Sequence, residues 1–442
     1  MSAERRAVAK ATRRLIPFLF GIYIVAYLDR VNVSFAQLQL EEDLGFSDTI
    51  FGLGAGIFSL GYVIFGMPSN ILLERFGARR WLSWIMMAWG TISASMLFIE
   101  GAGSFYVLRF LLGVAEAGFF PGIVLYLTWW FPEADRGRTL ALFMTAISAS
   151  YVAGGPISGG LLELDGLAGL DGWQWLFLCE GLPAIGLGFV ALRFLDDRPA
   201  DAAWLEADER EALSARIESE LQAKAGEGPG SRIRDALRSG QVWLFALIYF
   251  IILSAAFGLT FFVPDLVQER TGLSDFEVGA FAAVPYAFAT VAMVLLARRA
   301  DRSGRRRMYV IALLLIGAAG TVLTAYAQTV PLLTLSLILS TVGLLAVIPI
   351  FWSLPTGFLA GSAAAAGIGA IAAIGNLGGF GGPAFTGAME DSTGDFVTPF
   401  LVLAGLLVVG CVLTLLTREP EAVPVAEEPP APVPEAPGTT PA

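Results

Sequence analysis

The chain has 442 residues, of which 56% are hydrophobic and 15% are charged, and its mean hydropathy is +0.68. Soluble domains carry about 25% charged residues, so this composition indicates an integral membrane protein. The net charge of −11 gives no reason to expect a nucleic-acid partner.

The composition also argues against an enzyme. The chain contains no histidine, and its two cysteines, Cys179 and Cys411, lie in separate apolar runs, so we expect neither a metal site nor a disulfide framework. The only lysines, Lys10 and Lys224, both follow alanine, which excludes the Gly-Lys phosphate loop of an ATP-driven pump. We therefore expect no cofactor, and a gradient as the source of any energy that the protein uses.

Twelve apolar segments, each long enough for a membrane-spanning helix, follow one another along the chain. We predict an all-α membrane protein with one six-helix bundle over 1–195, a cytoplasmic linker over 196–240, a second six-helix bundle over 241–417, and a disordered cytoplasmic tail over 418–442. In the linker, Trp204, Leu205, Leu213, Ile217 and Leu221 recur at near-helical spacing and predict an amphipathic helix. The predicted spans are 15–38, 48–73, 81–99, 103–130, 139–163, 173–195, 242–267, 275–299, 307–327, 331–358, 364–389 and 396–417.

The placement of basic residues predicts the orientation in the membrane. With the N-terminus inside, Arg270 is the only Lys or Arg in a predicted outer loop, while Arg30 and Arg109 lie within spans. This bias predicts a multi-pass protein of a bacterial-type inner membrane with both termini in the cytoplasm. Nothing in this architecture requires more than a monomer.

The two halves of the sequence repeat with an offset of 227 positions. Gly154-Gly155-Pro156 corresponds to Gly381-Gly382-Pro383, and Glu163 corresponds to Glu390. Two charged loops correspond in the same way, and in each a glycine permits a tight turn while arginines can bind helix ends. We predict that these loops form an inner gate, and that a binding site lies near the midplane between the halves. The gate residues are Glu74, Arg75, Gly77 and Arg79 in the first loop, and Asp301, Arg302, Gly304 and Arg306 in the second.

These loops resemble the cytoplasmic signature of the major facilitator superfamily, and the resemblance covers nearly all of the chain outside its two tails. Three further motifs resemble the anion:cation symporter family, which includes bacterial tartrate, phthalate and hexonate permeases and the related sialin and vesicular glutamate transporters. The resemblance implies twelve helices in two pseudo-symmetric halves, and proton symport of a small organic anion by alternating access. The motifs are Tyr27-Leu28-Asp29-Arg30-Val31-Asn32, Pro68-Ser69-Asn70 and Phe351-Trp352-Ser353-Leu354-Pro355.

Four charged residues lie within the spans of the first half. Asp29 and Arg30 are neighbours in the first span, and each costs about 2.5–3.5 kcal/mol in a bilayer unless it faces protein or water. Arg109 and Glu116 are seven residues apart in the fourth span and therefore share a helix face. The resemblance implies proton sites at Asp29 and Glu116, with Arg30 and Arg109 binding a substrate carboxylate. Without histidine, proton transfer near pH 7 requires Asp or Glu. A permanent ion pair between helices is the structural alternative.

The second half supplies mainly uncharged candidates for the site, namely Tyr249, Trp352, Ser353 and Asn376. Tyr27 and Tyr62 match positions that line the site in the sugar-acid branch of the family. That branch usually has a glutamine where this chain has Ile147, which favours a small dicarboxylate or an aromatic carboxylate over a hexonate. Glu180 precedes Gly181 in the sixth span, and we expect it to have a structural role.

Other functions remain open on the sequence alone. Gly155-Pro156-x-x-Gly159-Gly160 resembles the antiporter signature of the superfamily, although such residues also allow close packing. Sodium could replace the proton, with Asn32 and Ser34 as oxygen ligands beside Asp29. A sensor built on a transporter body would need a soluble domain larger than the linker.

Overall fold

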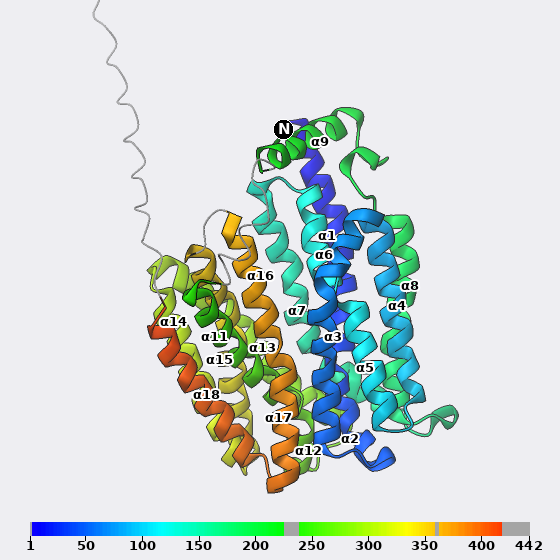
Figure 1. Ribbon diagram of the computed structural model, residues 1–442. Coiled ribbons are helices and arrows are strands. Elements are labelled where there is room, and N and C mark those ends of the chain that lie inside the picture. The colour runs from blue at the N-terminus through cyan, green and yellow to red at the C-terminus, as the bar shows by residue number, and fades with distance from the viewer. Residues whose placement is uncertain (1, 225–237, 359–361, 418–442) are drawn as a thin grey trace, which may run out of the picture.

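The computed structural model describes residues 2–224, 238–358 and 362–417, and it is helical through most of these residues (Figure 1). Helices satisfy their own backbone hydrogen bonds, which the interior of a bilayer requires. Twelve helical segments in the described residues are long and apolar enough to cross a membrane, so the predicted all-α membrane fold is confirmed. The predicted tail over 418–442, and linker residues 225–237, lie outside the described residues.

Several spans consist of two consecutive helices, because the helix is interrupted within the span. The first half contains α1 (Ala3–Val31), α2 (Val33–Leu44), α3 (Asp48–Phe76), α4 (Ala78–Ala94), α5 (Ala102–Glu116), α6 (Phe119–Trp130), α7 (Glu133–Leu162) and α8 (Gly172–Phe194). The connecting segment contains α9 (Ala207–Lys224). The second half contains α11 (Gly240–Thr260), α12 (Val263–Thr271), α13 (Asp275–Ser303), α14 (Arg306–Tyr326), α15 (Val330–Phe358), α16 (Ser362–Asn376), α17 (Gly378–Thr393) and α18 (Val397–Leu415).

Two equivalent helix pairs, α3 with α17 and α7 with α13, join the halves. A Cβ atom on Gly52 would overlap the Pro383 carbonyl, and a Cβ atom on Gly155 would overlap the Gly279 carbonyl. Gly52 and Gly279 are separated by the repeat offset of 227 positions. Glycine is therefore needed at both contacts because the backbones touch. This packing accounts for Gly155, and also for Gly159, whose Cβ would meet the backbone of α13.

The repeat extends to the starts of α3 and α13. Ser47 accepts a hydrogen bond from the Ile50 N–H at 3.4 Å, and Ser274 accepts one from the Glu277 N–H, also at 3.4 Å. Both serines are N-caps, and each is followed by an aspartate, Asp48 or Asp275. This Ser-Asp pair occurs at the repeat offset, but it was not predicted from the sequence.

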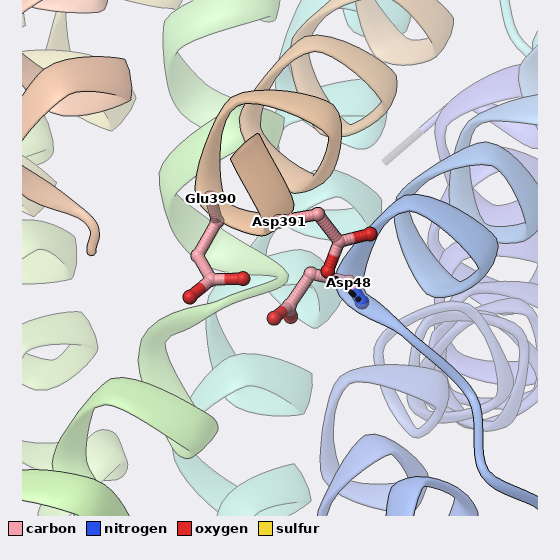
Figure 2. A group of neighbouring side chains, drawn as sticks. All are labelled: Asp48, Glu390 and Asp391. Carbon is pink, nitrogen blue, oxygen red and sulfur yellow. Dashed lines mark hydrogen bonds between the residues drawn. The ribbon is translucent and has the colours of Figure 1, made fainter. Parts of the chain in front are cut away.

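A cluster of carboxylates joins the halves at the start of α3, and Figure 2 shows Asp391 of α17 pointing toward Asp48. The Asp391 carboxylate accepts hydrogen bonds from the backbone N–H groups of Asp48, at 3.2 Å, and Thr49, at 2.9 Å. Asp48, Glu390 and Asp391 each have an oxygen within 4.8 Å of the others. Asp391 thus caps a helix of the other half. We call this end of the molecule the far end, since the N-terminus and α9 lie at the opposite end (Figure 1).

Helix α9 is attached to the N-terminal extension of α1. The Glu209 carboxylate accepts hydrogen bonds from Lys10 Nζ at 2.8 Å and Arg6 Nε at 3.3 Å. The predicted apolar face is present, since Leu213 and Ile217 are buried. The Trp204 ring, just before α9, stacks on Trp130 with centroids 5.5 Å apart. These contacts make the described part of the linker an extension of the first half.

Arg270, the exception to the predicted charge bias, has a structural role. Its guanidinium Nη1 donates hydrogen bonds to the Thr324 carbonyl at 2.6 Å and to the Ala327 carbonyl at 2.8 Å. These carbonyls lie at the C-terminal end of α14, where a helix lacks N–H partners of its own and favours a cation.

We expect Asp391→Ala to loosen the far end, because two N–H groups of α3 lose their acceptor. Loss of a cap costs about 1 kcal/mol, or roughly a five-fold change in an equilibrium. Electron–electron distance measurements between spin labels at Glu42→Cys and Ser392→Cys, with the two native cysteines replaced by serine, should gain a longer component.

Asp395→Ala is the matched control, since Asp395 accepts a hydrogen bond from the Val397 N–H at 2.9 Å within the second half. It should leave the label distances unchanged. Equal distributions in the two variants would contradict a clamp between the halves.

Glu209 should make the attachment of α9 sensitive to pH. The hydrogen bond from Lys10 lowers the pKa of Glu209 below its ordinary value. The carboxylate therefore stabilises the fold above the unfolded pKa of about 4.3, and this contribution is lost as the pH falls through the folded pKa. Glu209→Gln should lower the thermal unfolding midpoint at pH 7, and the difference from wild type should disappear as the pH falls below the folded pKa of Glu209. Glu211→Gln on the exposed face is the control, and an equal loss there would refute the assignment.

Candidate substrate and proton site

Three of the four predicted charged residues, and Asn376, lie where the spans are interrupted. Asp29 and Arg30 are in the last turn of α1, Glu116 is the last residue of α5, and Asn376 is the last residue of α16. Interruptions of this kind bring helix ends and polar side chains to the middle of a transporter. The last turn of α1 also favours the positive charge of Arg30 through the helix dipole.

Arg30 and Glu116 form an ion pair in the first half. The Arg30 Nη2 donates a hydrogen bond to Glu116 Oε1, and the exposed fractions of the two side chains are 15% and 3%. The second carboxylate oxygen, Oε2, has no hydrogen-bond partner among the described residues. Aromatic rings surround the guanidinium, whose carbon lies 5.2 Å from the Tyr27 and Phe58 centroids and 5.0 Å from that of Tyr62. The cation is therefore held by one carboxylate and three π-faces.

Asp29 is buried, and its hydrogen-bond partner differs from that of its neighbour Arg30. The Ser93 hydroxyl, on α4, donates a hydrogen bond to Asp29 Oδ1. The Asn32 side chain and the guanidinium of Arg109 are also within interaction range of the carboxylate. Asp29 and Glu116 therefore occupy different surroundings, because only Glu116 contacts a guanidinium directly.

Arg109 is fully buried and bonds to the backbone of α3. Its Nε donates to the Gly54 carbonyl at 3.2 Å and its Nη2 to the Ala55 carbonyl at 3.4 Å. The Phe58 ring lies 5.1 Å from this guanidinium and 5.2 Å from that of Arg30. The Phe58 ring thus lies near both guanidinium groups. Arg109 supplies positive charge to the buried acids.

A small pocket lies between the halves beside Arg30. Of the predicted site residues, Arg30, Tyr62 and Asn376 line this pocket, and Arg30 is the only charged residue among the described residues that line it. The other lining residues were not predicted, although Ser59 shares a helix face with Tyr62, and Phe257 and Phe261 are spaced as neighbours on one face. These residues are Phe58, Ser59, Phe257 and Phe261.

The remaining candidates of the second half lie close to one another. The Tyr249 ring is 5.0 Å from that of Trp352 and stacks on Phe351 at 5.3 Å. The Asn376 amide donates to the Ala372 carbonyl at 2.8 Å, and the Ser353 hydroxyl donates to the Ile350 carbonyl at 2.6 Å, each within its own helix. In this state both side chains therefore have an internal partner.

The two predicted gate loops follow α3 and α13 and turn at glycines with positive φ, 83° at Gly77 and 67° at Gly304. In the first loop, the Arg79 N–H donates to Asp197 at 2.8 Å and its Nε to the Leu192 carbonyl at 2.5 Å. In the second, Arg306 pairs with Asp301 at 2.9 Å. These bonds stay within their own halves. Glu74, Arg75 and Arg302 are exposed.

The chain is similar in sequence and in fold to known membrane transporters. The model of the major facilitator superfamily matches residues 19–380 and 257–440. A putative tartrate transporter of Agrobacterium vitis is 48% identical over 93% of this chain and 91% of its own length. A quinolone resistance transporter of Acinetobacter baumannii is 36% identical over 94% and 96%. A solved bacterial homologue of the human lysosomal transporter Spinster, inward-facing and occupied, is 16% identical over 91% and 96%, with a TM-score of 0.75.

The chain is thus a multi-pass membrane protein of a transporter class and not of an enzyme class. It belongs to the major facilitator superfamily, and the predicted resemblance and fold class are confirmed.

The buried ion pair should give a large coupling energy in a double-mutant cycle. Glu116→Gln or Arg30→Gln alone leaves one buried charge without its partner, which costs about 3 kcal/mol, whereas the double variant leaves none. We expect the double variant to unfold closer to the wild-type midpoint than the sum of the single changes predicts.

The exposed pair of Arg306 and Asp301 is the control cycle, and its coupling should stay below about 1 kcal/mol. Additive effects at Arg30 and Glu116 would show that the pair does not exist in the folded protein.

Proposed function

We propose that this protein imports a small organic anion together with protons by alternating access. The observation that carries this proposal is the Arg30 guanidinium, which borders the pocket between the halves and is paired with Glu116. A guanidinium binds a carboxylate with two parallel hydrogen bonds, so Arg30 suits an anionic substrate. The name of the 48% identical relative, a putative tartrate transporter, agrees with an organic anion.

The ion pair gives a physical basis for coupling. A substrate carboxylate and the Glu116 carboxylate compete for the same guanidinium. When a proton neutralises Glu116, the attraction that holds Arg30 weakens, and Arg30 becomes available to the substrate. Without proton and substrate, the pair re-forms and the site carries no unpaired charge. Proton and anion thus bind together and leave together.

Asp29 is the second proposed proton site. It lies within interaction range of Arg109 and Glu116, so its charge influences Glu116, the acid that pairs with Arg30. Arg109, which is bonded to the α3 backbone, then compensates the negative charge of whichever acid is ionised. Because the chain has no histidine, these carboxyl groups are the side chains suited to carry protons near pH 7.

We infer that the far end faces the outside and that the N-terminal end faces the cytoplasm, as the charge bias predicts. The contacts of Gly52, Gly155 and Asp391 then close the outer end, and on this assignment the structure represents an inward-facing state. The charged loops at Gly77 and Gly304 would form the inner gate, with their bonds rearranged between the halves in the opposite state.

The pocket favours a carboxylate whose remaining part is small or aromatic, which includes tartrate, phthalate and short sugar acids. Ser59, Tyr62 and Asn376 can hydrogen-bond to hydroxyl groups, and Phe257 and Phe261 offer aromatic surface. Gly375, which precedes Asn376, lies against the Tyr249 ring, and Tyr249 packs beside Trp352. Tyr27 borders Arg30, and Ser353 lies next to Trp352.

Proton-coupled antiport and sodium symport are the alternative functions. The 36% identical relative is named for quinolone resistance, which favours transport of a drug-like solute. The glycines of the antiporter-like motif have a packing role between the halves. For sodium, the Ser34 hydroxyl donates to the Val31 carbonyl at 2.7 Å, which leaves its oxygen lone pairs free to bind a cation together with oxygens of Asn32 and Asp29.

Thermal-shift measurements with a ligand panel test the anion proposal. We expect tartrate, phthalate or a sugar acid at 100 times its Kd to stabilise the purified protein by about 2.7 kcal/mol, while the corresponding amide has no effect. Arg30→Ala should remove the stabilisation. A response to neutral or cationic lipophilic compounds alone would support the antiporter instead.

Proton coupling predicts which transport activities the variants of the two acids lose and which they keep. Asp29→Asn and Glu116→Gln should each abolish accumulation driven by a pH gradient in proteoliposomes, because neither variant can bind and release the proton. Counterflow exchange should survive in at least one of them, since exchange does not require proton release. Ser336→Ala, a change at a buried hydroxyl bonded within α15, is the control. Undiminished accumulation in both acid variants would refute the proton assignment.

A further inference from the structure

Glu180 of α8 is a buried acid that the proposed transport cycle does not use. Its exposed fraction is 4%, and the Ser158 hydroxyl of α7 donates a hydrogen bond to Glu180 Oε1 at 2.9 Å. Among the described residues, the groups that interact with Glu180 are Ser158, Asn32 and Asp29, and none of them is a cation. A purely structural acid in such surroundings would normally be replaceable by a neutral amide, and a carboxyl group here is costly.

Glu180 faces the proposed proton site. The Asn32 side chain, at the interruption between α1 and α2, is buried with no hydrogen-bond partner for its amide among the described residues, and it lies within interaction range of both Glu180 and Asp29. Asp29 also acts electrostatically on Glu180. Asn32, Asp29 and Glu180 therefore form one polar group that connects α1 with α8.

On its other side, Glu180 contacts the helix that joins the halves. Ser158 lies on α7 next to Gly159, whose Cβ would meet the backbone of Asp275 and Phe276 on α13. One turn earlier, Gly155 touches Gly279. A change at Glu180 thus acts on α7 at the position where α7 packs against the second half.

We propose that Glu180 is a positioning residue for proton coupling, which senses the charge of Asp29 through Asn32 and acts on α7 through Ser158. This inference rests on the proposed proton symport. Two like charges in a medium of low polarity repel each other, so an ionised Glu180 favours the protonated form of Asp29. When Asp29 is protonated, that repulsion disappears, and Glu180 and its bond to Ser158 are stabilised.

Other charged groups face the same acids and have to be held constant in a test. Arg109 and Glu116, both of α5, act on Asp29, and the Ser93 hydroxyl of α4 bonds to it. Arg30 is paired with Glu116. None of these is altered by a change at Glu180.

The test is the pH dependence of substrate uptake by Glu180→Gln in proteoliposomes, with the substrate that the ligand panel identifies. Glutamine keeps the size and an oxygen that accepts the Ser158 hydrogen bond, but it removes the charge. We expect the midpoint of the pH profile to move about one unit toward acid, because Asp29 holds its proton less tightly. The KM measured at saturating proton concentration should not change, since Glu180 is not among the residues that line the pocket.

Ser158→Ala provides a second variant that stays informative if Glu180→Gln does not fold. Loss of the donor disfavours the ionised form of Glu180, so the midpoint should move in the same direction by a smaller amount. Glu163→Gln removes a charge from the exposed end of α7 and should leave the profile unchanged.

The outcomes separate this inference from the proposed function. If wild-type uptake depends on pH, and Glu180→Gln and Ser158→Ala keep the same midpoint as the wild type, the role of Glu180 is overturned and proton symport stays intact. Wild-type uptake that is independent of pH would overturn both. Equal shifts in Glu163→Gln and Glu180→Gln would assign the effect to surface charge and overturn the inference.

Discussion

The structure depends on partners for charged side chains, because an unpartnered charge is costly in free energy inside a membrane. Each of Asp29, Arg30, Arg109 and Glu116 carries an insertion cost of about 2.5–3.5 kcal/mol when it is unpartnered. Arg30 is held by Glu116 and aromatic rings, Arg109 by carbonyls of α3, and Asp29 by Ser93. The interruptions of the first and fourth spans place Asp29, Arg30 and Glu116 at helix ends, and Arg109 lies two turns before the end of α5. A transporter can use such an arrangement because each pairing can be exchanged for a substrate or a proton.

The packing between the halves follows the repeat in the sequence, whereas the charged residues do not. The contacts of Gly52 with Pro383 and of Gly155 with Gly279 involve two glycines, Gly52 and Gly279, that are separated by the offset of the duplication, so the interface between the halves has nearly two-fold symmetry. The charges do not repeat. The buried ion pair lies in the first half, and the second half lines the pocket with Phe257, Phe261 and Asn376. The interface between the halves thus follows the duplication, whereas the charged site does not.

Much of this organisation could be predicted from the sequence, because its signals are local. Apolar length predicted the twelve spans, and charged residues inside those spans identified Asp29, Arg30 and Glu116 as candidates. The loops at Gly77 and Gly304 were recognisable because both copies are present. The helical periodicity around Leu213 and Ile217 predicted α9.

What could not be predicted depends on contacts between distant segments. Ser93 and Ser158 are ordinary hydroxyl residues in sequence, and only the packing of α4 and α7 brings them to Asp29 and Glu180. The cap that Asp391 places on α3 joins residues more than 340 positions apart. Arg109 matched a substrate-binding position, yet its hydrogen bonds to α3 carbonyls depend on how α3 and α5 pack. Phe257 and Phe261 gave no signal that distinguishes them from other phenylalanines.

The most direct test of proton-coupled anion import is the internal pH of proteoliposomes during uptake. A pH-sensitive dye is enclosed at equal pH on both sides, and tartrate or phthalate is added outside with the membrane potential clamped. The account predicts that the interior becomes more acid as the anion enters, and that Glu116→Gln liposomes show no such change. Alkalinisation during uptake would indicate antiport, and uptake without any pH change would contradict proton coupling.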